Sequence, residues 1–237
     1  MMIHNKHLWP FCRKYGWRPW CLREEFLDNL CSLFPIQLMK VTRASLSVVS
    51  DLLQDSRLKD LKLLFLLRDP RAVMHSRSGY EWCQESKDCR EPSILCQHLE
   101  QDFETMSQLQ ADFPNRIMYL RYEDFAAKPK SEILHAINFL GLKHTEAMER
   151  MIEKKIDKNG KLIAHSADTS SNVWQSQMAY EKINEVQESC TKAMALWGYK
   201  VFEYEDIHPN RAVLPIDILP KIIDTNFVKN QDSDEFS

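Results

Sequence analysis

The sequence predicts an α/β protein with a parallel sheet flanked by helices. Three short apolar segments, at 36–41, 62–67 and 115–120, have the length and composition of strands. Helical patterns separate these segments, and strands that alternate with helices indicate βαβ units. A chain of 237 residues can form one sizeable domain or two small ones. We expect one domain over residues 1–221, followed by a polar, disordered tail over 222–237.

The helices are predicted from apolar residues that recur at spacings of three and four positions. We expect them within residues 22–34, 45–55, 93–112, 130–142 and 180–199. Gly141 and Gly198 follow the apolar patterns of the last two, where glycine commonly ends a helix. Asp69 and Pro70 predict a further helix directly after the second strand, with aspartate as its cap and proline at its first position.

Composition excludes several classes of protein. The net charge of −3 argues against a general nucleic-acid coat, so any anion-binding chemistry must be local. No apolar run approaches the roughly 18 residues of a membrane helix, and the first twelve residues lack the apolar core of a signal peptide. The five glycines are isolated from one another, so the chain lacks a glycine-rich loop of the kind that holds phosphates.

The cysteines favour a disulfide over a metal site. None of the seven forms a C-x-x-C pair, the usual element of a zinc site, so we expect no metal. Cys83 and Cys89 bracket the short polar sequence QESKD, a spacing that suits a local disulfide. Reduced, buried cysteines are equally compatible with this spacing.

The segment with the most chemical information is LKLLFLLRDPRAVMHSR, in which an apolar strand runs directly into charged residues. Arg68 follows the strand, at the edge of a parallel sheet where ligands gather. Ser76 lies about two turns into the next helix, so a guanidinium and a hydroxyl could converge on a phosphate. The alternative is a structural salt bridge that joins Arg68 or Arg71 to Asp69 or Asp124.

Several segments resemble one known family. LLFLLRDPRAVMHSR resembles the 3′-phosphate-binding segment of the Golgi carbohydrate sulfotransferases, in the branch that sulfates the 6-position of galactose, N-acetylgalactosamine or N-acetylglucosamine. Four other segments of this chain resemble further parts of the same family, namely WCQESKDCREP, MYLRYEDFAAKP, ILHAINFLGL and SSNVWQSQMAYEKINEVQESCTKAMALWGYKVF. Together these matches cover about residues 36–203, in the family's order.

The resemblance implies a fold, a reaction and site residues. The fold would be an incomplete P-loop-like sulfotransferase fold. The donor would be 3′-phosphoadenosine-5′-phosphosulfate and the acceptor a 6-hydroxyl of a glycan or glycosaminoglycan such as keratan or chondroitin sulfate, without a metal. Arg68 and Ser76 would bind the donor's 3′-phosphate. Trp174 is expected near the donor, with an ordinary core aromatic as the alternative. Residues 122–124 are expected to be structural, and no catalytic base is assigned.

The chain also departs from the family pattern. The family's first strand, with its loop around the 5′-phosphosulfate, has no counterpart upstream of residue 36, and neither do its membrane anchor and stem. Gln175 stands where the family usually carries an arginine. In the family this loop stabilises the transferring group in the transition state. Without it, we expect this chain to be a weak or inactive enzyme. An incomplete gene model or an alternative transcript would explain the departure.

Two functional interpretations therefore remain, and a third is weaker. The chain is either a truncated carbohydrate sulfotransferase or a non-catalytic protein that binds the nucleotide and a glycan. An unrelated nucleotide enzyme such as a kinase is disfavoured because there is no glycine-rich loop for a triphosphate. The resemblance implies the Golgi lumen, an oxidising compartment that favours pairing of Cys83 with Cys89.

Overall fold

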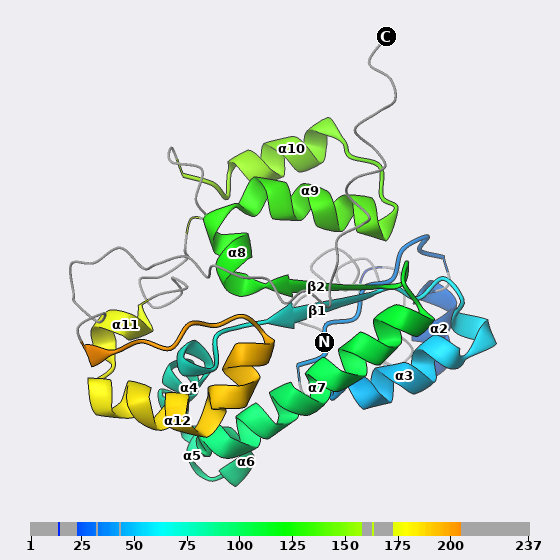
Figure 1. Ribbon diagram of the computed structural model, residues 1–237. Coiled ribbons are helices and arrows are strands. Elements are labelled where there is room, and N and C mark those ends of the chain that lie inside the picture. Colours follow the sequence, from blue (N-terminus) through cyan, green and yellow to red (C-terminus); the bar gives the residue numbers. More distant parts are fainter. Residues whose placement is uncertain are drawn as a thin grey trace. The chain divides into compact units, whose positions relative to one another are not determined.

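The structure is a computed structural model (Figure 1). It describes residues 14, 23–31, 33–42, 44–157, 163 and 173–204. The chain divides into two compact units, Met1–Ala44 and Ser45–Ser237. The predicted tail at 222–237 lies outside the described residues, and a single domain over 1–221 stays a prediction.

The first unit contains helix α2, Glu24–Cys31, within the predicted range 22–34. The prediction of a strand at 36–41 is wrong, because these residues form no strand. Their apolar side chains are exposed, Leu38 by 90% and Met39 by 82%. An apolar segment becomes a strand only when a second strand satisfies its backbone, and the sheet of the described residues pairs two other segments.

The sheet of the second unit consists of two parallel strands. Strand β1 is Leu63–Leu67 and strand β2 is Ile117–Arg121. In their register Leu63 pairs with Ile117, and Leu67 pairs with Arg121. The predictions of strands at 62–67 and 115–120 and of parallel pairing are therefore confirmed. Because the strands are parallel and in register, their carboxyl ends lie side by side at one edge.

Helices flank this sheet, and about half of those in the second unit fall where the sequence predicts a helix. In the second unit they are α3 (Leu46–Gln54), η2 (Ser56–Leu58), α4 (Pro70–Ser78), α5 (Glu81–Gln84), α6 (Lys87–Arg90), α7 (Pro92–Asp112), α8 (Tyr122–Ala127), α9 (Pro129–Leu140), α10 (Glu146–Glu153), α11 (Trp174–Gln177) and α12 (Tyr180–Leu196). Gly141 and Gly198 have φ of 69° and 73°, a left-handed conformation that favours glycine. Both therefore end helices as predicted.

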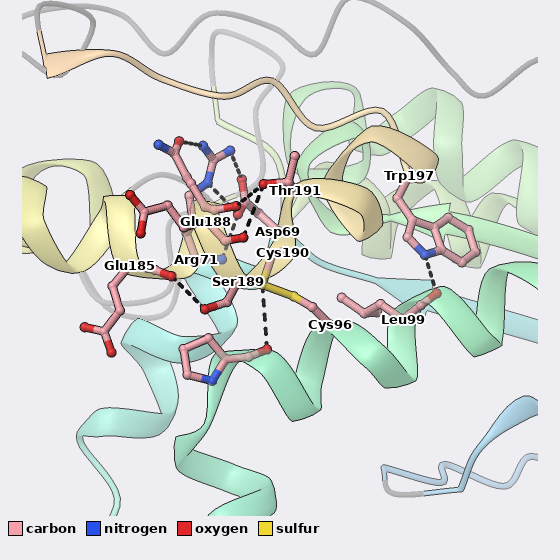
Figure 2. Close-up of a disulfide and its surroundings, with 12 residues drawn as sticks. Asp69, Arg71, Cys96, Leu99, Glu185, Glu188, Ser189, Cys190, Thr191 and Trp197 are labelled. Atoms are coloured by element: carbon pink, nitrogen blue, oxygen red, sulfur yellow. Dashed lines mark hydrogen bonds and ion pairs between the residues drawn. A yellow bond between two sulfur atoms is a disulfide. The ribbon is translucent and has the colours of Figure 1, made fainter.

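The main core lies between the sheet and the packed pair α7 and α12. Its centre is Trp197, which is fully buried. The indole contacts Phe65 of β1 and Tyr119 of β2, with ring centroids 5.8 Å and 6.0 Å away. It meets Phe103 of α7 edge to face at 5.0 Å, and its Nε1 donates to the carbonyl of Leu99 at 2.8 Å (Figure 2). One side chain thus holds both strands and both helices together.

Two disulfides tie the helices of the second unit. Cys83–Cys89 joins α5 to α6, so the pairing favoured by the resemblance is confirmed. Cys96–Cys190, which the sequence did not predict, joins α7 to α12 across 94 residues (Figure 2). A loop of this length stabilises the fold by roughly 4–5 kcal/mol in the chain-entropy account. Of the cysteines in the described segments, Cys31 is the free and exposed one.

Candidate functional site at the carboxyl ends of the strands

The transition from β1 to α4 is fixed by three consecutive residues. Asp69 has φ −47° and ψ 124°, outside the helical region, and its side chain accepts a hydrogen bond from the backbone N–H of Arg71 at 2.8 Å. Pro70 occupies the first helical position. The predicted cap is therefore confirmed, and α4 begins without an intervening loop. As a result Arg68 lies at the junction between strand and helix.

Arg71 forms the structural salt bridge that the sequence left open as an alternative. Its guanidinium is 1% exposed and donates to both carboxylate oxygens of Asp69, at 3.0 Å and 2.7 Å (Figure 2). Its Nη1 donates a hydrogen bond to Oε1 of Gln187 at 2.7 Å. Gln187 in turn holds the backbone N–H and carbonyl of Phe202. Arg71 is thus fully engaged within the fold, where it joins α4 to α12.

Trp174 packs beneath this buried ion pair. The guanidinium of Arg71 lies 4.7 Å from the centre of the indole, and the ring of Phe202 lies 6.1 Å away. Trp174 is 2% exposed and belongs to a small core cluster with Ala72 and Ile183. This packing favours the alternative of a core aromatic, while a place beside the donor stays a prediction.

Arg68 is engaged in a different way. It is half-buried, and its guanidinium lies over the ring of Tyr122 with 5.0 Å between the charged carbon and the ring centre. Its Nε is buried without a hydrogen-bond partner among the described residues, and their ion pairs do not include it. A buried N–H without a partner costs roughly 1–3 kcal/mol, which an anionic ligand would recover. The salt-bridge alternative therefore holds for Arg71 and not for Arg68.

Ser76 lies on α4, two turns after the strand end, with its side chain exposed. Within the described part of the chain no hydrogen bond occupies its hydroxyl or joins it to Arg68. The neighbouring His75 bonds Gln177 through Nε2 and Oε1 at 2.8 Å, which attaches α4 to α11. The structure therefore places Arg68 and Ser76 on consecutive elements, both available to a ligand but not in mutual contact.

The end of β2 braces the end of β1. Glu123 accepts a hydrogen bond from the backbone N–H of Asp69 at 3.0 Å through one carboxyl oxygen, and from the hydroxyl of Tyr199 at 3.1 Å through the other. Arg121 donates to both oxygens of Asp124, at 2.6 Å and 3.1 Å. These contacts support the structural interpretation of residues 122–124.

Glu123 lies in an unfavourable environment for a charge. Burial, and next the negative charge of Asp69, raise the pKa of its carboxyl to about 7. Burial also raises the pKa of Tyr199 well above its ordinary value, so this hydroxyl remains a donor. The brace between the strand ends therefore changes its protonation close to neutral pH.

The sequence reasoning did not single out Gln187. Its position within the helix 180–199 carries the one available signal, because it lies four residues after the buried Ile183, on the apolar face of α12. A polar residue on a buried helix face needs a buried partner. The identity of that partner, Arg71, depends on a contact across 116 residues that periodicity does not encode.

In the described segments, no three His, Cys, Asp or Glu side chains are grouped so that they could hold a metal ion. No helix in the same segments combines the length and apolar character that a membrane span requires.

Comparison with known proteins identifies the family. Residues 36–198 match the family described as the sulfotransferase domain. Human carbohydrate sulfotransferase 6 is 27% identical over 83% of this chain and 56% of its own length. Mouse carbohydrate sulfotransferase 3 is 28% identical over 75% of this chain and 42% of its own length. The human form of the latter is 30% identical over 71% of this chain and 39% of its own length.

The chain thus spans about half the length of the curated relatives it matches. No solved structure matches it. The family match covers more than half of the chain and contains both strands, α4 and the disulfide-linked helices. The parallel strands of this chain, flanked by helices, agree with the predicted α/β fold class. The chain belongs to the sulfotransferase family and resembles its carbohydrate sulfotransferases.

Proposed function

We propose that this chain takes part in sulfuryl transfer from 3′-phosphoadenosine-5′-phosphosulfate to a 6-hydroxyl of a sugar in a glycan. The observation that carries the proposal is the buried Nε of Arg68 at the carboxyl end of β1, which has no hydrogen-bond partner within the described segments. A parallel sheet binds its ligands at this edge, and a guanidinium suits a phosphate. Arg68 and the exposed hydroxyl of Ser76 would hold the 3′-phosphate of the donor.

In the reaction the acceptor oxygen forms a bond to sulfur while the bond between sulfur and the 5′-phosphate oxygen breaks. The acceptor's proton passes to a base, and the nucleotide leaves as 3′-phosphoadenosine-5′-phosphate. Such a transfer depends on placing the two reactants in line and on stabilising the charge of the leaving phosphate. Holding the 3′-phosphate contributes to the first requirement, because it fixes the donor at the far end from the transferring group.

The place of action that we propose is the Golgi lumen. Two disulfides within the described residues support an oxidising compartment, because such bonds are rare in reducing ones. The names of the relatives support a carbohydrate acceptor. Trp174, which lies against Arg71 in the first turn of α4, remains a proposed neighbour of the donor.

The test is calorimetric titration of the purified chain with 3′-phosphoadenosine-5′-phosphate. We expect Arg68→Ala to weaken binding by about 1.5–3 kcal/mol and Ser76→Ala by about 0.5–1.5 kcal/mol, as for charged and neutral hydrogen bonds. Arg57→Ala is the matched control, because its side chain is 85% exposed on η2 and bonded to Asp55. Absence of binding by the folded wild-type chain would contradict the proposal. Binding of the nucleotide by a chain that transfers no sulfuryl group from 3′-phosphoadenosine-5′-phosphosulfate to a sugar would identify a nucleotide-binding protein instead.

A further inference from the structure

Two exposed aromatic rings lie stacked directly after α4. The ring centres of Tyr80 and Trp82 are 5.7 Å apart and their planes meet at 30°. The residues are 52% and 53% exposed, so about half of each faces solvent. Large aromatic side chains are usually among the best-buried residues because they carry much apolar area. About half of this stacked pair is therefore accessible to a ligand.

The backbone under this pair is held firmly. The N–H of Tyr80 donates to the carbonyl of Arg77 at the end of α4, at 3.1 Å, and its own carbonyl accepts from the N–H of Cys83 at 3.0 Å. Cys83 and Cys89, 2% and 6% exposed, anchor the following helices through their disulfide. Rings that are already stacked on a fixed backbone lose little freedom when a ligand binds.

The geometry of the pair selects the kind of ligand. Stacked rings present a flat π face, which is electron-rich and attracts the weakly positive C–H groups of an aliphatic ring. A second pair with an exposed member, Tyr180 and Tyr204, meets at 88° with centres 5.2 Å apart, and there the edge of one ring covers the face of the other. The flat faces at Tyr80 and Trp82 suit a pyranose ring, whose C–H groups project from one side.

We propose that Tyr80 and Trp82 form a subsite for one pyranose ring of the acceptor glycan. The proposal rests on the function proposed above, because it takes the acceptor class from it. Tyr80 follows Ser76 by four residues, which span at most about 14 Å of chain. Because Ser76 is assigned to the 3′-phosphate, at the far end of the donor from the transferring group, the acceptor must also span the donor to reach this pair, which requires a glycan of several sugars. The pair would select the acceptor chain at a sugar other than the one that receives the sulfuryl group.

The experiment is saturation-transfer NMR and titration of the full chain with two probes, an unsulfated N-acetyllactosamine tetrasaccharide and an unsulfated chondroitin tetrasaccharide. We expect at least one probe to bind and Trp82→Leu to weaken it by about fivefold, because leucine keeps apolar area but removes the π face. Trp82→Phe keeps a π face and should retain most of the affinity. Tyr80→Leu provides a second variant, and Tyr204→Ala is the matched control.

Nucleotide titration of the same variants separates this proposal from the one it rests on. We expect Trp82→Leu to bind 3′-phosphoadenosine-5′-phosphate as the wild type does. Nucleotide binding by a wild-type chain that binds neither probe would overturn the subsite and leave the proposed function standing. Equal sugar affinity of wild type and Trp82→Leu would also overturn it. If the wild-type chain itself does not bind the nucleotide, the result would instead count against the proposed function.

Discussion

The two strand ends lie side by side, and each carries an arginine in a different state. At the end of β2, Arg121 is 3% exposed and makes a two-pronged ion pair with Asp124. At the end of β1, Arg68 is half-buried, contacts an aromatic ring and leaves its Nε without a partner among the described residues. The comparison separates a cation that builds the fold from a cation that can receive an anion.

The same contrast distinguishes Arg68 from Arg71, three residues further along. Arg71 is saturated by Asp69 and Gln187, so its positive charge is already compensated. A motif that contains two arginines therefore offers one to a ligand. Sequence spacing could not make this distinction, because both side chains follow the same strand.

The largest expected difference is in the free energy of unfolding of Arg121→Met and Arg68→Met, measured by chemical denaturation. We expect Arg121→Met to lower the free energy of unfolding by about 3 kcal/mol, because the carboxylate of Asp124, which is about a third exposed, loses both of its hydrogen bonds to the buried guanidinium. Arg68→Met should lower it by no more than about 1 kcal/mol, since it removes the contact with Tyr122 but no ion pair. Similar losses in the two variants would show that Arg68 has a structural role as well.

An effect of similar size is expected from the pH dependence of the brace between the strand ends. The pKa of Glu123 is raised to about 7 from an ordinary 4.5, mainly by burial, so the folded chain holds this proton more tightly than the unfolded chain. The stabilising contribution is complete below about pH 4.5 and is lost as pH rises through about 7, on the order of 3 kcal/mol in all. Above pH 7 the dependence should level off.

Denaturation curves of wild type and Glu123→Gln between pH 5 and 8 measure this effect. Glutamine keeps an acceptor for the backbone N–H of Asp69 but has no proton to exchange, so the difference between the two proteins should change with pH. Glu81→Gln, which changes an exposed carboxyl on α5, is the matched control. A constant difference across this range would rule out Glu123 as the titrating group.

The smallest expected effect concerns the ring beneath Arg68. Tyr122→Leu removes the π face that holds the guanidinium, an interaction of about 0.5–1 kcal/mol, so affinity for 3′-phosphoadenosine-5′-phosphate should fall by about threefold. Tyr122→Phe keeps the face and should bind nearly as the wild type does. Calorimetry distinguishes the two, and equal weakening in both variants would assign the effect to the phenolic hydroxyl.

Local patterns predicted much of this fold, for reasons visible at individual residues. Asp69, Pro70, Gly141 and Gly198 act on their own backbone, so their positions mark helix boundaries directly. The apolar residues of β1 and β2 also indicate strands without knowledge of their partners. The segment 36–41 has a similar composition and forms no strand, because pairing depends on a neighbour that local sequence does not specify.

The site was predicted less completely than the fold. Arg68 and Ser76 could be selected because their types and spacing after a strand suit a phosphate, and that role stays a prediction. The structural roles of Arg71 and Glu123 depend on hydrogen bonds with Gln187 and Tyr199, respectively, which lie far away in sequence. Trp174 shows the limit of a motif, since an aromatic side chain can line a site or fill a core, and only its burial favours the latter.

The bond between Cys96 and Cys190 also affects how the protein matures. It closes a covalent ring that contains β2 and the helices α8, α9, α10 and α11, whereas β1 precedes the ring. Cys83 and Cys89 can pair as soon as α6 has been synthesised, but Cys96 must wait for α12. During this interval Cys96 is a thiol without its native partner in a chain that also carries Cys31. Correct oxidation therefore depends on Cys190 of α12 reaching Cys96 before another thiol does.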